Sequence, residues 1–239
     1  GYALVMLTQN TLIGVRDPFG IRPLVIGKIN DSYVFASETC ALDIIGAKFI
    51  RDVDNGEIVY IENGKLNSIK PFPPKKIRPC VFEYIYFSRP DSILNGECAY
   101  EYRKRLGAEL AKETKIDADL VVPVPDSGNA AAIGFSKHTG KNFDLGLIRN
   151  HYVGRTFIEP AQKIRSLGVK LKLNANKSSI KNKKIVLIDD SLVRGTTSHK
   201  IVKMLYDAGA KEVHMGIACP QIRFPDFYGV DMPTKKELL

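Results

Sequence analysis

The chain has 239 residues, of which 44% are hydrophobic, and it carries a formal net charge of +9. These values fit one large or two ordinary globular domains with real hydrophobic cores, and they exclude a disordered or fibrous chain. No apolar run approaches the length of a membrane span and no basic-apolar leader is present, so we expect no membrane partner.

The part of the chain before the proline-rich stretch 71–79 has the pattern of a β-rich unit. Short β-like runs alternate there with turn signals such as Asn30-Asp31 and Asn63-Gly64. One short helix is expected at 40–45. The expected strands are 2–7, 12–15, 24–28, 33–36 and 58–61.

After the prolines, helical and strand patterns alternate along the chain. This order predicts a parallel sheet with right-handed crossovers. The sequence therefore divides near residue 75 into two parts, 1–75 and 76–239. The expected helices of the second part are 101–115, 130–138 and 198–207, and its expected strands are 120–123, 184–189 and 213–218.

The most informative segment is 184–197, which leads from a strand into two acids and a glycine-containing loop. Its apolar run 185–188 lacks alternation, which is typical of a strand buried on both faces of a parallel sheet. Asp189 and Asp190 then lie at the carboxyl end of this strand, where open α/β sheets bind ligands. The acids suit a metal or sugar hydroxyls. The alternative is a solvated strand end.

The loop after the acids suits a monophosphate. Gly195 allows the backbone to approach a phosphate closely, and we expect Thr196 or Thr197 to cap the helix that follows, whose first amides would point at the anion. The alternative for this loop is an ordinary capped turn.

Two further segments belong to the same predicted edge. The strand before Ser127 should lie beside 184–189, so Ser127 either completes a magnesium site with Asp189 and Asp190 or caps the next helix, and both roles can hold together. The irregular segment 149–175 contains two glycines and six basic residues, which favours a lid that closes over a pyrophosphate.

Charge and cysteine usage narrow the class of partner and compartment. Segment 137–184 has twelve basic and two acidic residues, and this excess attracts polyanions. Nucleic-acid-binding signatures are absent, so a small pyrophosphate ester is favoured and no nucleic acid is expected, although 177–184 remains compatible with a solvated basic surface.

The cysteines, which lack C-x-x-C spacing, are expected to be reduced in a cytoplasmic protein. They are Cys40, Cys80, Cys98 and Cys219.

The strand, acidic pair and Gly-Thr-Thr loop resemble the signature of phosphoribosyltransferases that use phosphoribosyl pyrophosphate (PRPP). With the segments at 121–128 and 149–162, the resemblance narrows to the family of glutamine PRPP amidotransferases. Further stretches that match this family are 16–24, 36–38, 82–92, 223–225 and 228–231.

The resemblance implies a mixed α/β and α+β architecture. Residues 1–75 would be the later part of a glutaminase domain of the N-terminal-nucleophile (αββα) class, and 76–239 a type I phosphoribosyltransferase domain with a parallel sheet. Members of the family transfer glutamine-derived ammonia to C1 of PRPP, releasing 5-phosphoribosylamine, glutamate and pyrophosphate, in the first committed step of purine (IMP) synthesis.

The resemblance also implies residue roles, with Mg²⁺ as the cofactor. Asp189 and Asp190 would hold ribose hydroxyls and Mg²⁺, with Ser127 as a further ligand, while Arg155 and Lys172 would contact pyrophosphate. The 5-phosphate loop would be Ser191, Leu192, Val193, Arg194, Gly195, Thr196 and Thr197, and the closed lid would be shaped by Tyr152, Thr156, Phe157 and Gln162. Purine nucleotides as feedback inhibitors and a homo-oligomer follow from the same resemblance.

Two departures from the family pattern carry expectations of their own. The family's nucleophilic cysteine has no match, since the chain opens at Gly1 on an expected strand, so we expect a fragment without glutaminase activity. Cys80 matches one ligand of the iron–sulfur cluster found in some members, but Asp226 stands at another, so no iron–sulfur cluster is expected.

Rival functions are a non-catalytic PRPP sensor, which would need a DNA-binding module that this sequence does not show, and a salvage phosphoribosyltransferase, which would not need the N-terminal half.

Overall fold

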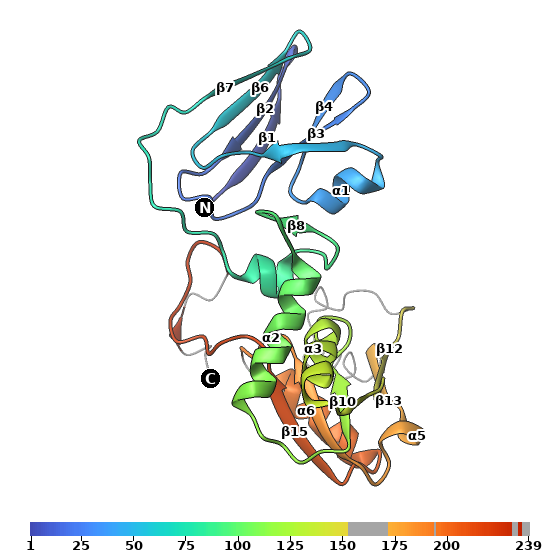
Figure 1. The fold of residues 1–239 in the computed structure, drawn as a ribbon. Coiled ribbons are helices and arrows are strands. Elements are labelled where there is room, and N and C mark those ends of the chain that lie inside the picture. The colour runs from blue at the N-terminus through green and yellow to red at the C-terminus, as the bar shows by residue number, and fades with distance from the viewer. Residues whose placement is uncertain (153–171, 194, 231–233, 236–239) are drawn as a thin grey trace, which may run out of the picture. The chain divides into compact units, whose positions relative to one another are not determined.

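The computed structural model describes residues 1–152, 172–193, 195–230 and 234–235 (Figure 1). The chain divides into two compact units. The first contains 1–102 and 225–233, and the second contains 103–224 and 234–239. The functional boundary expected at residues 75 and 76 remains a prediction.

The first unit contains two antiparallel sheets. One has the order β1-β2-β6-β7 and the other β4-β3-β5. Buried Ile26 of β3 and Val59 of β6 belong to one hydrophobic cluster, so the two sheets pack on each other. The bounds are β1 (Ala3–Leu7), β2 (Thr11–Arg16), β3 (Val25–Ile29), β4 (Ser32–Ala36), α1 (Thr39–Ile44), β5 (Lys48–Asp52), β6 (Ile58–Glu62) and β7 (Lys65–Ile69).

The sequence-based prediction missed β5 and β7, although a signal for β7 was present. Asn63 and Gly64 have φ values of 50° and 72°, which is the conformation of a tight hairpin turn joining β6 to β7. The polar side chains of β7 do not have the pattern of a buried strand, because β7 forms the edge of its sheet.

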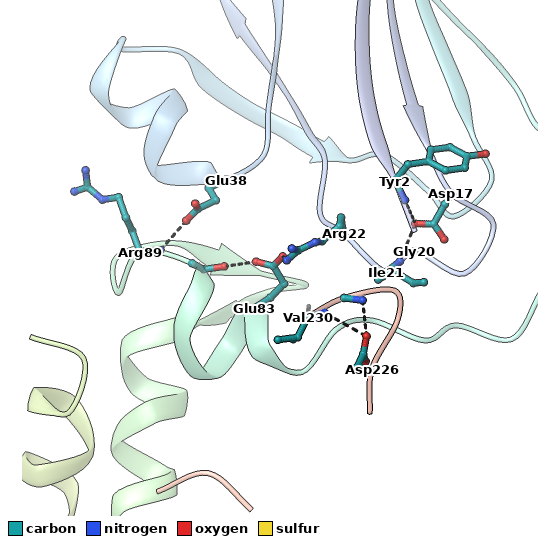
Figure 2. A network of polar contacts seen from close by, with 12 residues as sticks. Tyr2, Asp17, Gly20, Ile21, Arg22, Glu38, Glu83, Arg89, Asp226 and Val230 are labelled. Carbon is teal, nitrogen blue, oxygen red and sulfur yellow. Dashed lines mark hydrogen bonds and ion pairs between the residues drawn. The ribbon is translucent and has the colours of Figure 1, made fainter. Parts of the chain in front are cut away.

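Polar contacts join distant segments of the first unit (Figure 2). Arg22 Nη1 lies 2.5 Å from Glu83 Oε1 and its guanidinium stacks 4.5 Å from the Phe87 ring centroid. Glu38 Oε2 accepts hydrogen bonds from the backbone N–H of Arg89 and the hydroxyl of Ser92, both at 2.7 Å. The matched stretches 16–24 and 36–38 thus each contact the stretch 82–92.

The loop at 226–230 is closed by its own acid. Asp226 Oδ1 accepts backbone hydrogen bonds from Tyr228, Gly229 and Val230 at 2.8, 2.7 and 3.2 Å. A Cβ on Gly229 would lie 2.5 Å from Cys80 Sγ, so the loop packs directly on this buried thiol. The Asp226 carboxylate therefore closes a turn beside Cys80.

The connection toward the second unit contains a π-helix η1 (Glu83–Phe87) and a small hairpin, β8 (Ile93–Leu94) and β9 (Glu97–Cys98). Helix α2 (Ala99–Glu113) follows and continues into the second unit. The aromatic sequence of η1 has no helical period, and the sequence-based prediction missed it.

The second unit is built on a parallel sheet of order β11-β10-β14-β15, which confirms the expected parallel topology. A separate antiparallel pair is formed by β12 and β13. The bounds are β10 (Leu120–Pro123), α3 (Asn129–Thr139), β11 (Asn142–Phe143), β12 (Leu147–Arg149), β13 (Leu173–Ala175), α5 (Lys177–Ile180), β14 (Lys184–Asp189), α6 (Thr196–Asp207) and β15 (Glu212–Ile217).

Strand β14 is covered on both faces, as its uninterrupted apolar sequence predicts. Ile185 and Leu187 pack into a cluster with residues of α6, whereas Val186 and Ile188 pack into a cluster with residues of α2 and α3. Burial on both faces holds the end of this strand in place.

Helices α2 and α3 approach each other closely at glycines. A Cβ on Gly107 of α2 would lie 1.8 Å from the Ala131 carbonyl oxygen, and one on Gly134 of α3 would lie 1.9 Å from the Lys104 carbonyl oxygen. The crossing therefore leaves no space for a side chain at either position. Within the described ranges, no helix has the length and apolar character needed to cross a membrane.

Candidate functional site

The candidate site lies where β10 and β14 end side by side. The two strands are parallel, with Pro123 opposite Ile188, and the Val124 N–H donates to the Ile188 carbonyl oxygen at 2.8 Å. A Cβ on Gly128 would lie 2.4 Å from that same oxygen, so the loop 124–128 passes very close to the end of β14. This packing brings Ser127 and the acidic pair to one edge of the sheet.

The acidic pair is held by the backbone and poorly satisfied at one oxygen. Asp189 Oδ1 accepts the Asp190 N–H at 2.9 Å, and the Asp190 carbonyl oxygen accepts the Cys219 N–H at 2.8 Å. The buried Asp190 Oδ2 has no hydrogen-bond partner among the described residues. A buried acceptor of this kind favours a cation or a hydroxyl donor supplied by a ligand.

Burial and mutual repulsion also shift the proton affinity of the pair. Burial, with the neighbouring Asp190 charge, raises the pKa of Asp189 to about 8. Burial raises the pKa of Asp190 as well, while interactions with Asp189, its backbone surroundings and the Ser127 side chain oppose that rise. The pair therefore retains a proton near neutral pH unless a positive charge replaces it.

The donor set can be tested against Mg²⁺ on these observations. No group of three or more His, Cys, Asp or Glu side chains in the described ranges could hold a metal. The site instead offers two carboxylates, one with an unpartnered oxygen, and the Ser127 hydroxyl. Mg²⁺ is commonly bound by one or two carboxylates together with waters and substrate phosphates, so these residues fit a cation that arrives with a phosphate ester.

The predicted phosphate loop leads directly into helix α6. Gly195 has the left-handed φ of 66° and is the N-cap residue of α6, which begins at Thr196 and has no side-chain cap. The expected helix start near Ser198, with a threonine cap, was therefore wrong. The left-handed glycine makes the turn into the helix, and the first-turn amides are of the kind that bind anions.

Ser127 is likewise not a helix cap. Helix α3 begins at Asn129, its N-cap residue is Gly128, and no side chain caps it. The capping alternative for Ser127 is thus wrong, and its side chain interacts instead with Asp190. The peptide bond between Pro125 and Asp126 in this loop is cis.

The described part of the predicted lid consists of its two ends. Strands β12 and β13 pair, and the Asn150 N–H continues the ladder by donating to the Lys172 carbonyl oxygen at 2.8 Å. The Tyr152 side chain is fully exposed. The other predicted lid and loop residues lie outside the described residues, so their roles remain predictions. These are Arg155, Thr156, Phe157, Gln162 and Arg194.

Sequence reasoning missed one contact at this edge. Arg149, the last residue of β12, donates from Nη1 to Asp126 Oδ2 in the loop after β10. Arg149 and Asp126 are 23 residues apart in sequence, and no local sequence pattern predicts that they pair. A hollow on the β12–β13 pair, lined by Ile148, Asn174, Asn176 and Lys177 among others, also contains Arg149.

No protein-family model matches this chain. Individual relatives match it along its whole length and agree with one another. The amidophosphoribosyltransferase of Rhizobium etli is 56% identical over all of this chain, which covers 49% of that relative, and that of Archaeoglobus fulgidus is 48% identical, with 52% of the relative covered.

A solved structure agrees with these relatives. The glutamine PRPP amidotransferase from B. subtilis, complexed with ADP and GMP, superposes with a TM-score of 0.91 at 48% identity over the whole chain, which covers 52% of that protein. The chain thus spans about half the length of the relatives it matches.

Proposed function

We propose that this chain, which belongs to the amidophosphoribosyltransferase family and spans about half the length of its relatives, carries the phosphoribosyl-transfer site of such an enzyme. The substrate would be PRPP and the nucleophile ammonia, derived in the whole protein from glutamine. The observation that carries the proposal is the acidic pair with its unpartnered Asp190 oxygen, at the strand end that leads into the helix N-terminus of α6.

The reaction would be a displacement at the anomeric carbon of the ribose. The C1–O bond to pyrophosphate breaks with its electron pair leaving on pyrophosphate, and the ammonia nitrogen forms the new C1–N bond. Positive charge develops on the sugar during this change. Asp189 and Asp190 would accept hydrogen bonds from ribose hydroxyls and stabilise that charge.

The phosphate ends of the substrate would be held by backbone and basic groups. The loop 191–197 and the first turn of α6 would bind the 5-phosphate, while Arg155 and Lys172 would contact the pyrophosphate, with Tyr152 and Gln162 in the lid. Mg²⁺, held by Ser127, Asp189 and Asp190 directly or through water, would supply charge neutralisation for the departing pyrophosphate.

The remaining features of the whole protein are part of the same proposal. Residues 1–75 would belong to a glutaminase domain and 76–239 to the transferase domain. The B. subtilis relative complexed with ADP and GMP supports purine nucleotides as feedback inhibitors. We further propose a homo-oligomer in the cytoplasm.

The test is the double substitution of Asp189→Asn and Asp190→Asn in the protein expressed from its complete reading frame. We expect ammonia-dependent formation of phosphoribosylamine to be lost while glutamine hydrolysis survives. The matched control is Asp207→Asn at the exposed end of α6, which should retain synthesis. Near-wild-type synthesis by the double variant would contradict the assignment.

A further inference from the structure

An ion pair at the edge of the site joins two segments that the proposed function treats separately. Arg149 ends β12 at the root of the lid, and Asp126 precedes Ser127 in the loop after β10. The two residues are 23 positions apart in sequence, and their side chains are 46% and 51% exposed. The guanidinium donates directly to the Asp126 carboxylate.

This pair differs from the ion pairs that join neighbours on one helix of the second unit. The Lys184–Asp117 pair also joins distant segments, but it lies at the first residue of β14, at the opposite end of the strand from the acidic pair. Lys112–Glu109 and Lys203–Asp207 join neighbours on one helix, at spacings of three and four residues. Exposed pairs of that kind contribute little to stability. The Arg149–Asp126 pair has similar exposure, so its placement at the site, not stabilisation of the fold, is its distinguishing property.

The negative charge of Asp126 would disfavour binding of a polyanion to its loop. Asp189 and Asp190 already place two acids at this edge of the sheet, and Asp126 adds a carboxylate one residue before Ser127. Left unpaired, that carboxylate would repel the pyrophosphate of PRPP, because like charges at close range disfavour binding. Arg149 is the cation that the structure places on it.

We propose that Arg149 is a positioning residue that acts through Asp126: it neutralises this carboxylate and so keeps loop 124–128 open to the pyrophosphate group. The inference rests on the proposed function, since it assumes PRPP as the ligand. It assigns the pair a role in substrate affinity and none in the chemical step.

The test is a mutant cycle in the protein expressed from its complete reading frame, with saturating ammonia, low ionic strength and varied PRPP. Arg149→Gln leaves the acid unpaired and should raise the KM for PRPP about fivefold, with kcat within about twofold. Asp126→Asn removes the repulsive charge and should lower KM. The double variant should return KM to within about twofold of the wild type, because no net charge is then left at the pair.

Two further variants separate charge from structure. Arg149→Lys keeps the cation and should keep KM within about twofold, and Glu109→Gln breaks an exposed pair on α2 as the matched control. The effect of Arg149→Gln should shrink at high salt, since the interaction is exposed. Equal melting temperatures of all variants would exclude a folding defect as the cause.

The outcomes distinguish this inference from the proposed function. A wild-type protein with no PRPP-dependent activity overturns both. An active wild type whose KM is unchanged by Arg149→Gln overturns the inference alone. So does an Asp126→Asn variant that raises KM as much as Arg149→Gln with no recovery in the double variant, since the pair would then act as a mechanical link and not as a charge shield.

Discussion

The raised pKa of Asp189 predicts that the acidic pair lowers the stability of the ligand-free protein as pH increases. Burial raises this pKa from an ordinary 3.8 to about 8, so the folded state holds a proton that the unfolded state has already released. The folded state is therefore penalised progressively between about pH 4 and pH 8. Replacing Asp189 by Asn removes the buried charge and should remove most of this penalty.

The magnitude follows from the proton affinities. Each tenfold difference in proton affinity corresponds to about 1.4 kcal/mol, and about three such steps separate pH 5 from pH 8. The wild type should thus lose up to about 4 kcal/mol of unfolding free energy in the second unit across this range, relative to Asp189→Asn. Because Asp189 and Asp190 repel each other and titrate together, the 4 kcal/mol is an upper value for Asp189.

The assay is native-state hydrogen exchange of the Ile185–Ile188 amides in the presence of a metal chelator, corrected for the intrinsic pH dependence of exchange. These residues are fully buried in β14, so their exchange reports the opening of the strand that carries the pair. Asp207→Asn, an exposed acid on the same unit, is the control. Equal pH dependence in the wild type and Asp189→Asn would show that the folded state does not bind the Asp189 proton more tightly than the unfolded state.

Three further predictions concern other parts of the chain. Glu57 is buried, but hydrogen bonds from Arg51 and Ser68 lower its pKa to about 2, so Glu57→Gln should cost about 2 kcal/mol at pH 7 in urea denaturation, with the difference fading as pH falls from about 4.5 toward 2. Gly107→Ala should lower the free energy of unfolding by about 1–3 kcal/mol, because its Cβ would overlap a backbone oxygen of α3. The melting temperature should fall accordingly, whereas Glu109→Ala should have a small effect. Anaerobically purified protein should contain no stoichiometric iron or acid-labile sulfide; their presence would make Cys80 a cluster ligand.

The sequence predicted the elements whose pattern is set by burial. Strand β14 was placed at its observed bounds because four consecutive apolar residues need cover on both faces, and the parallel sheet followed from the alternation of helices and strands. Elements with mixed or polar patterns were missed, among them β7 and η1. Their conformation depends on neighbouring strands and on contacts such as Arg22 with Glu83, which no local pattern contains.

The candidate site also has parts that the sequence predicted and parts that it did not. A strand end, two acids and a glycine could be located from local sequence, and the structure places Ser127 beside Asp190 as the parallel arrangement requires. The start of α6 could not, because a left-handed Gly195 and a threonine cap predict helix starts only one or two residues apart. The pairing of Arg149 with Asp126 depends on how the β12–β13 pair meets the loop after β10.

Residue-resolved hydrogen exchange of the protein expressed from its complete reading frame, with and without PRPP and Mg²⁺, tests directly whether this edge of the sheet binds PRPP. We expect slower exchange on ligand addition at two places together: the amides of 195–198 at the start of α6 and those of 126–128 in the loop after β10. The exposed C-terminal turn of α2 should be unaffected. Unchanged exchange at both places at saturating ligand would contradict the proposal that this edge of the sheet binds PRPP.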